Sequence, residues 1–539
     1  MEGVGQDDSA PPDSGTPLVK HAVLVGSLTL LSRITGLART VIIAHFLGTG
    51  PVAGAFRIAV MLPNMFRRFV GEGALSSAFI PLYTEYCETR SEQETQLFAE
   101  RFFTLWLGAL LVLTSVGSLS LGWVIPLLPD DGIFNDPVTL DLTVRLSQLA
   151  FWYLLAIACA ALGQAILTAR RHFAAPSFAP VVANLGFVAS VFLLVRWFAP
   201  GREPYAMVCA FLFGGLCQFL FLLWPLWRAG VRLRLRLPFH DSGVQRALRL
   251  LGPGTLGAGV YQINIVVSTV LAANLANDHA VASLSNSNLI LEFVLGICVM
   301  ALNTVGLPQL SRHATQCDEG AFGALVARLA RLTQFITIPS SVGLLVIHVP
   351  VLSLLLESGE FGPTSLEFTA MAFRFHVLGI VFVGWNRGLI SCFHARKDMH
   401  TPLRLAVISV TVNLILAYLL SRTPLGHGGI ALAATLSAMV HTVCLGVAIR
   451  RALPAVRFVG LWVSVLRSIV AAAAMGGVCL AWMAWLPMDG NKWVLGGQLF
   501  LVISTGALTY FVVAWCLQAS ELRWLTAAIR KRLSSSRPS

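Results

Sequence analysis

Apolar runs of about 20 residues recur along almost the whole chain, and each is long enough to cross a bilayer as a helix. Of the 539 residues, 56% are hydrophobic and 12% are charged, about half the charged fraction of an average soluble protein. Short alternating strands, typical of a transmembrane β-barrel, do not occur in the pattern. The sequence therefore predicts an all-α polytopic membrane protein. We place fourteen transmembrane helices near residues 22–47, 53–82, 103–128, 146–168, 177–195, 206–227, 251–275, 282–308, 333–356, 369–392, 403–421, 428–449, 459–486 and 494–517.

The net charge of +12 is distributed unevenly between the predicted loops. With a cytoplasmic N-terminus, the cytoplasmic loops and tail carry about 24 Lys and Arg, and the opposite loops carry about 4. Residues 129–141, predicted outside, hold four aspartates and no basic residue. Because cytoplasmic loops of membrane proteins are enriched in basic residues, both termini are predicted to face the cytoplasm.

Two predicted cytoplasmic turns carry the same pattern. Ala169-Arg170-Arg171 is followed by Pro176, and Ala395-Arg396-Lys397 is followed by Pro402 at the same spacing. The offset of 226 residues corresponds to six spans, an even number, so both copies have the same orientation. This predicts two parallel six-helix lobes around a central cavity, although basic residues and proline are common enough in turns for a coincidence. Each turn leads into a helix with one isolated asparagine, Asn184 or Asn413.

The spans and the repeat together predict the domain organisation. We expect a disordered cytoplasmic N-terminal tail (1–21), an N-terminal six-helix lobe (22–229), a basic amphipathic cytoplasmic linker (230–250), a C-terminal six-helix lobe (251–450), helices 13 and 14 (451–518) and a basic cytoplasmic tail (519–539).

The first two spans contain five arginines, Arg33, Arg39, Arg57, Arg67 and Arg68. An arginine at the bilayer centre costs roughly 3 kcal/mol or more, so these side chains are expected to line a wet, cationic cavity that holds an anion. The neighbouring Arg67 and Arg68 suit a diphosphate, because guanidinium binds phosphate bidentately. Counting from the tip at 48–50 places Arg33 level with Arg67, and Arg39 level with Arg57. The alternative, snorkelling to an interface, is equally favoured for Arg57.

Other charged residues in the apolar runs are weaker candidates. Glu72 is interpreted as a charge partner of an arginine, and Glu292 is the other buried acid to test. Arg374 and Arg387 add two cations in the tenth span. The chain has no Walker A, HExxH or GxSxG motif and no Cys/His cluster, so we expect no catalytic residue, metal or cofactor. Transport without a nucleotide site would run downhill, on an unidentified coupling cation, or on the membrane potential, at about 2.3 kcal/mol per charge per 100 mV.

Several stretches occur together in one known family. They are residues 32–39 (SRITGLAR), 62–74 (LPNMFRRFVGEGA), 78–81 (AFIP), 262–264 (QIN), 307–311 (LPQLS) and 393–398 (FHARKD) followed by Thr401-Pro402. The chain thereby resembles, over essentially its full length, the MurJ (MviN) family of lipid II flippases, in the multidrug/oligosaccharidyl-lipid/polysaccharide exporter superfamily. The second-span motif is specific to this family, and the other stretches are weak by themselves.

The resemblance implies a transporter, not an enzyme. It would flip undecaprenyl-diphosphate-linked disaccharide-pentapeptide (lipid II) from the inner to the outer leaflet of the bacterial inner membrane by alternating access, for peptidoglycan synthesis, cell wall biogenesis and cell shape. The implied partners are lipid II, membrane lipids and the cell-wall synthesis machinery, without nucleic acid. The family's functionally required arginines match Arg33, Arg39, Arg67 and Arg68, and Glu72 matches its usual acid. Helices 13 and 14 would form a groove for the polyprenyl tail. Asn64, Gln262 and Asn264 are secondary cavity candidates.

The chain departs from the family pattern at several charged positions. Gly54 and Thr40 replace acids, and Met61 replaces a base for which Arg57, one turn earlier, would substitute. Asn288-Leu289 replaces an Asp-Arg pair in the eighth span. Two alternatives to lipid II flipping therefore stay open. One is a flippase or exporter for another anionic lipid-linked glycan, and the other is a non-transporting membrane scaffold with the same fold.

Overall fold

The computed structural model describes residues 15–69, 75, 79–128, 132–198, 201–237, 242–316, 318–454, 456, 458, 460–487 and 491–524. Within these ranges, side chains are described except for residues 15–23, 242, 250–261 and 297–308. Glu72, predicted as a charge partner, lies outside the described residues.

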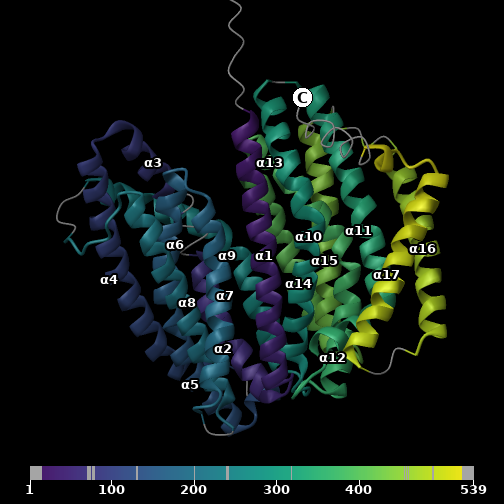
Figure 1. Cartoon of the computed structure of the whole chain (residues 1–539), viewed down its shortest axis with the longest axis horizontal. Coiled ribbons are helices and arrows are strands. Elements are labelled where there is room, and N and C mark those ends of the chain that lie inside the picture. Colours follow the sequence, from purple (N-terminus) through teal and green to yellow (C-terminus); the bar gives the residue numbers. More distant parts are fainter. Residues whose placement is uncertain are drawn as a thin grey trace, which may run out of the picture.

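The regular elements of the described chain are helices connected by short turns (Figure 1). The first half contains α1 (Gly15–Leu47), α2 (Pro51–Arg67), α3 (Ile80–Thr89), α4 (Glu92–Val124), the short 3-10 turns η2 (Ile125–Leu127) and η3 (Gly132–Phe134), α5 (Pro137–Phe151), α6 (Tyr153–Ala169), α7 (Ala174–Leu194) and α8 (Glu203–Arg228). The second half contains α9 (Ser242–Ala273), α10 (Ala280–Thr315), α11 (Glu319–Leu356), α12 (Pro363–Leu378), α13 (Ile380–Ala395), α14 (His400–Ser421) and α15 (His427–Ala452). Two further helices follow, α16 (Leu461–Trp485) and α17 (Lys492–Cys516).

Helices occupy all fourteen predicted spans. Among the described residues, 10 spans are long and apolar enough to cross a membrane, or 11 when α12 and α13, which meet at a bend of 46°, are taken as one. The three other predicted spans contain α2, α9 and α10 and do not reach that length and hydropathy within the described residues. The chain is therefore a multi-pass, all-helical membrane protein.

Exposed tryptophans lie near both ends of the helices, as in the aromatic belts of membrane proteins. We call the end of the molecule that holds the turn at 48–50 the tip end, and the end where α1 begins the terminal end (Figure 1). Exposed tryptophans of the tip end are Trp123, Trp197, Trp485 and Trp493. Those of the terminal end are Trp224, Trp227, Trp462 and Trp515.

The two basic turns found in the sequence have the same backbone path. Arg171 and Lys397 are both left-handed, with φ of 63° and 62°. In each copy, the amide three positions after the last helical residue donates back into the helix, from His172 to the Leu167 carbonyl (2.8 Å) and from Asp398 to the Phe393 carbonyl (3.0 Å). Both helices therefore end in a Schellman motif.

The two isolated asparagines also have equivalent partners. Asn184 on α7 donates to the Thr35 hydroxyl on α1 (3.1 Å), and Asn413 on α14 donates to the Asn264 side-chain oxygen on α9 (2.6 Å). Both bonds connect residues that are 149 positions apart. The α1–α7 contact thus recurs as the α9–α14 contact, and the structure contains the internal repeat.

The helices of the two halves form two groups that converge at the tip end and spread toward the terminal end (Figure 1). α1 lies between them and packs against both α7 and α10. α16 and α17 stand at the outer side of the second group, where α16 packs on α11. Two helices extend into segments that the sequence predicted to lie outside the two lobes. α1 starts at Gly15, inside the predicted tail 1–21, since Pro17 is tolerated in a first helical turn, and α9 starts at Ser242, inside the predicted linker 230–250.

Candidate functional site

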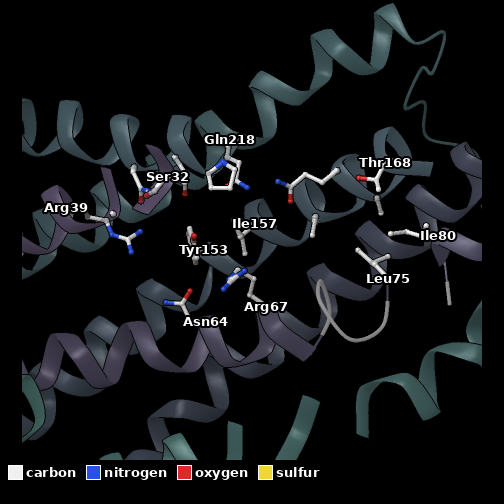
Figure 2. Close-up of a pocket in the computed structure, with 17 residues that line it drawn as sticks. Ser32, Arg39, Asn64, Arg67, Leu75, Ile80, Tyr153, Ile157, Thr168 and Gln218 are labelled. Atoms are coloured by element: carbon white, nitrogen blue, oxygen red, sulfur yellow. The ribbon is translucent and has the colours of Figure 1, made fainter. Parts of the chain in front are cut away.

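A cavity of about 470 Å³ lies among α1, α2, α6, α7 and α8 of the first half (Figure 2). Its volume is comparable to that of small-molecule sites. Its described polar lining comes from five helices and consists of Ser32, Arg39, Asn64, Arg67, Tyr153, Gln164, Thr168, Asn184 and Gln218.

Arg39 reaches this cavity from α1. Its guanidinium carbon lies 5.0 Å from the centre of the Phe211 ring on α8, a cation–π contact that fixes the side chain without neutralising it. The Arg39 Nε is buried and has no hydrogen-bond partner among the described residues. A buried donor of this kind is normally satisfied, so this one suits a bound acceptor such as an anion.

Arg67 enters the same cavity from the last turn of α2, with Asn64 one turn before it on the same face. Figure 2 shows Tyr153 between Arg39 and Arg67, and Gln218 on the opposite wall. The described lining contains these two arginines and no carboxylate. Two guanidinium groups in one cavity favour an anionic ligand.

Arg33 lies outside the described lining, although its neighbour Ser32 is part of it. Successive residues on a helix point about 100° apart, so Arg33 faces α10 instead. Its Nη1 donates to the Glu292 carbonyl (2.7 Å). Gly296, one turn further along α10, makes room for it, since a Cβ there would lie 2.3 Å from the Arg33 guanidinium carbon.

Glu292 and Arg387, noted separately in the sequence, form an ion pair. The Arg387 Nη2 on α13 donates to both Glu292 carboxylate oxygens, at 2.8 and 2.7 Å. Both side chains are partly exposed. Together with Arg33, they make a charged cluster where α1 meets the second half.

Arg57 also contacts the second half. Its Nη2 lies 2.5 Å from the side-chain oxygen of Asn286 on α10, and Asn286 is fully buried. Arg57 does not belong to the described lining of the cavity. Four of the five arginines are thus divided: Arg39 and Arg67 line the cavity of the first half, whereas Arg33 and Arg57 contact the second half.

The turn at the tip end provides a third contact between the halves. The Thr49 hydroxyl is 2.7 Å from the Nδ1 of His279 and 2.8 Å from the hydroxyl of Ser365. Gly48 is left-handed (φ 60°), and a Cβ there would lie 2.5 Å from the Glu360 carbonyl, so only glycine allows this approach. The halves are therefore locked together at the tip end.

The remaining candidates lie apart from the cavity lining. Arg68 follows Arg67 and is half-buried, whereas Arg374 is exposed. Gln262 is buried on α9, and Asn264 takes part in the α9–α14 bond.

Among the positions that depart from the family pattern, Thr40 and Gly54 are buried, whereas the Asn288-Leu289 pair is not. Thr40 is buried and donates to the Gly36 carbonyl (3.2 Å), and Gly54 packs near Ile133. Asn288 is exposed and Leu289 is half-buried.

Sequence reasoning missed several polar residues of the cavity. Tyr153, Gln164 and Gln218 were not selected as candidates, and Asn184 was noted only for the repeat. Gln164 and Gln218 are isolated amides in otherwise apolar helices, which is the signal that would have identified them.

The sequence matches a known protein family over most of its length. A family model described as "Lipid II flippase MurJ" matches residues 43–503. A Treponema pallidum protein described as "Probable lipid II flippase MurJ" is 34% identical over 447 residues, covering 81% of this chain and 83% of the relative. A Rhizobium meliloti protein of the same description is 32% identical over 532 residues, covering 96% of this chain and 97% of the relative.

The fold also matches solved structures. A structure described as lipid II flippase MurJ in an inward closed conformation has a TM-score of 0.76 at 23% identity and covers 91% of this chain and 98% of that chain. An inward-facing multidrug resistance MATE transporter of the MOP superfamily has a TM-score of 0.65 at 15% identity, covering 81% and 98%. At these identities, the structural matches concern the fold alone.

Proposed function

The chain belongs to the lipid II flippase MurJ family, and from this membership we propose that it moves lipid II from the inner to the outer leaflet of the bacterial inner membrane. Both termini would face the cytoplasm, and the product would supply peptidoglycan synthesis and the cell-wall machinery. The protein is thereby assigned as a transporter of a lipid-linked anion.

The observation that carries the proposal is that Arg39 and Arg67 line the same cavity. The head group of lipid II is joined to its lipid by a diphosphate, and guanidinium groups bind phosphate oxygens with charge-assisted hydrogen bonds. The unsatisfied Nε of Arg39 provides one such donor. The amides of Asn64, Asn184 and Gln218 would hydrogen-bond the sugars.

Alternating access would use the contacts between the halves. Thr49 with His279 and Arg57 with Asn286 hold the tip end closed in this state. Releasing both would open the cavity side of the molecule toward the outer leaflet, while α16 and α17, packed outside the repeat, would guide the polyprenyl tail.

Complementation of a bacterium depleted of its own flippase tests the proposal. The wild-type chain is expected to restore growth, and Arg39→Ala and Arg67→Ala are expected to abolish it at unchanged membrane abundance. Arg145→Ala is the control, because Arg145 is exposed and pairs with Asp141 on its own helix. Full growth of both cavity variants would contradict the cavity role. Failure of the wild type, together with flipping of another lipid-linked glycan in liposomes, would reassign the substrate.

A further inference from the structure

An extended segment on the outer side of the first half has a regular composition that the proposed function does not use. Residues 231–237, which we call the strap, read Val-Arg-Leu-Arg-Leu-Arg-Leu and follow α8. Arg232, Arg234 and Arg236 alternate with the leucines along the sequence, and all three arginines are exposed. A bond from the Arg234 amide to the Arg232 carbonyl (3.1 Å) turns the strap locally at Leu233.

The strap is attached to α4 by hydrogen bonds to two side chains that lie about two helical turns apart. Gln96 donates to the Arg232 carbonyl (2.5 Å) and accepts from the Arg232 amide (3.3 Å), and Thr104 accepts from the Arg236 amide (2.7 Å). These bonds hold the strap along the terminal-end part of α4, at the outer edge of the molecule (Figure 1).

An apolar groove begins where the strap ends. It has a volume of about 740 Å³ and is lined by Thr104, Leu105, Gly108, Ala109, Val112, Leu113, Val116 and Leu237. Gly108 keeps the groove open, because nothing lies within 4 Å of the position of an added Cβ. Thr104 connects the two features, since it binds the strap and forms the upper wall of the groove.

The charges of the strap are only partly compensated. Glu100 lies 3.6 Å from Arg236, and no ion pair involves Arg232 or Arg234 among the described residues. The neighbouring Leu235 and Leu237 are 71% and 63% exposed. The strap places three cations beside exposed leucines and an apolar groove. This combination matches an amphiphile that has a negative head group and acyl chains. A soluble polyanion fits less well, because it would leave the leucines in water.

We propose that the strap and the α4 groove form a binding site for an anionic glycerophospholipid, separate from the cavity of Arg39 and Arg67. The arginines would bind the head-group phosphate, and the groove would hold an acyl chain. The site lies on the side of the first half away from α16 and α17 (Figure 1), and α4 contributes no residue to the described cavity lining. Its position on the terminal end, the basic side in the sequence, places it in the leaflet where anionic lipids attract basic residues.

Native mass spectrometry of the full-length protein, titrated with phosphatidylglycerol or phosphatidylcholine, tests the proposal. The wild type is expected to retain phosphatidylglycerol preferentially. R232Q/R234Q is expected to lose roughly tenfold or more of that affinity, because each basic residue near an anionic surface contributes a several-fold effect. R450Q/R451Q is the matched control, since it removes the same charge from the exposed end of α15.

A second variant separates the groove from the charges. Gly108→Leu fills the groove while all arginines remain. It is expected to weaken the binding of long-chain phosphatidylglycerol but not the binding of phosphatidylglycerol with six-carbon chains. Equal retention of phosphatidylglycerol by wild type and R232Q/R234Q would overturn the site. An equal loss in R450Q/R451Q would also overturn it, by showing a general effect of charge. Complementation by R232Q/R234Q reports on the lipid II role independently.

Discussion

Arg57 on α2 and Asn286 on α10 connect the two halves of the molecule through a 2.5 Å hydrogen bond close to the tip end. Asn286 is fully buried, so the bond is shielded from water. Thr49 and His279, at the start of the same two helices, form a second link nearer the tip. Opening the tip end requires both links to break, which makes them a determinant of the conformational equilibrium.

Asn286→Leu is expected to shift this equilibrium toward tip-end opening. The substitution removes the acceptor of a hydrogen bond to a charged group, a bond that contributes about 1.5–3 kcal/mol, and leaves Arg57 facing an apolar side chain. Distances between spin labels at residues 52 and 366 would detect a larger population of molecules in which the tip end is open. Asn288→Leu on the exposed side of α10 is the control, and an unchanged distance distribution for Asn286→Leu would show that the bond does not hold the halves together.

Thr49→Val is expected to weaken the same closure through the turn itself. Valine has nearly the shape of threonine but cannot hydrogen-bond His279 or Ser365. The buried Ser365 hydroxyl and the partly buried His279 ring therefore each lose a partner, at a cost of about 1–3 kcal/mol. Faster labelling of a cysteine introduced at Leu366, next to Ser365, would report the change. Thr423→Val, at an exposed turn of α14–α15, provides the comparison, and equal labelling rates would rule out the link.

Gly296→Ala is expected to lower flipping although alanine is the better helix former. Alanine usually stabilises a helix interior by about 1 kcal/mol relative to glycine. Here the new Cβ would lie 2.3 Å from the Arg33 guanidinium carbon, so Arg33 must leave the Glu292 carbonyl. Complementation together with thermal unfolding would separate loss of function from loss of stability. Gly477→Ala has open space at the Cβ and should behave as wild type; a fully active Gly296→Ala would show that Arg33 is not needed there.

Glu521→Ala is expected to destabilise the packing of the C-terminal helices. Glu521 is 1% exposed and binds both the Arg331 Nε (2.7 Å) and the Ser464 hydroxyl (2.8 Å). Removing it leaves a largely buried Arg331 without its charge partner, which costs about 3 kcal/mol or more. The unfolding temperature of the purified protein would be measured against Glu367→Ala, an exposed acid on α12. Equal unfolding temperatures would contradict a structural role for the pair.

The sequence predicts the helices well because of the solvent in which they fold. Inside a bilayer every backbone donor and acceptor must be satisfied within the segment, so an apolar run of sufficient length becomes a helix whatever its neighbours are. The repeat was visible for a related reason. The Ala-Arg-Arg and Ala-Arg-Lys turns and the isolated Asn184 and Asn413 are local features, and both copies keep the same local geometry.

The partners of the charged side chains were decided by the tertiary structure. Counting residues from the tip gives the depth of each arginine but not the direction in which it points, so Arg33 appeared level with Arg67. The packing of α1 instead turns Arg39 toward Arg67 in the cavity and directs Arg33 to α10. The pairing of Glu292 with Arg387, 95 positions apart, likewise depends on how α10 and α13 are rotated about their axes. Rotation and contact between helices result from side-chain packing over the whole bundle, and no single segment of sequence contains that information.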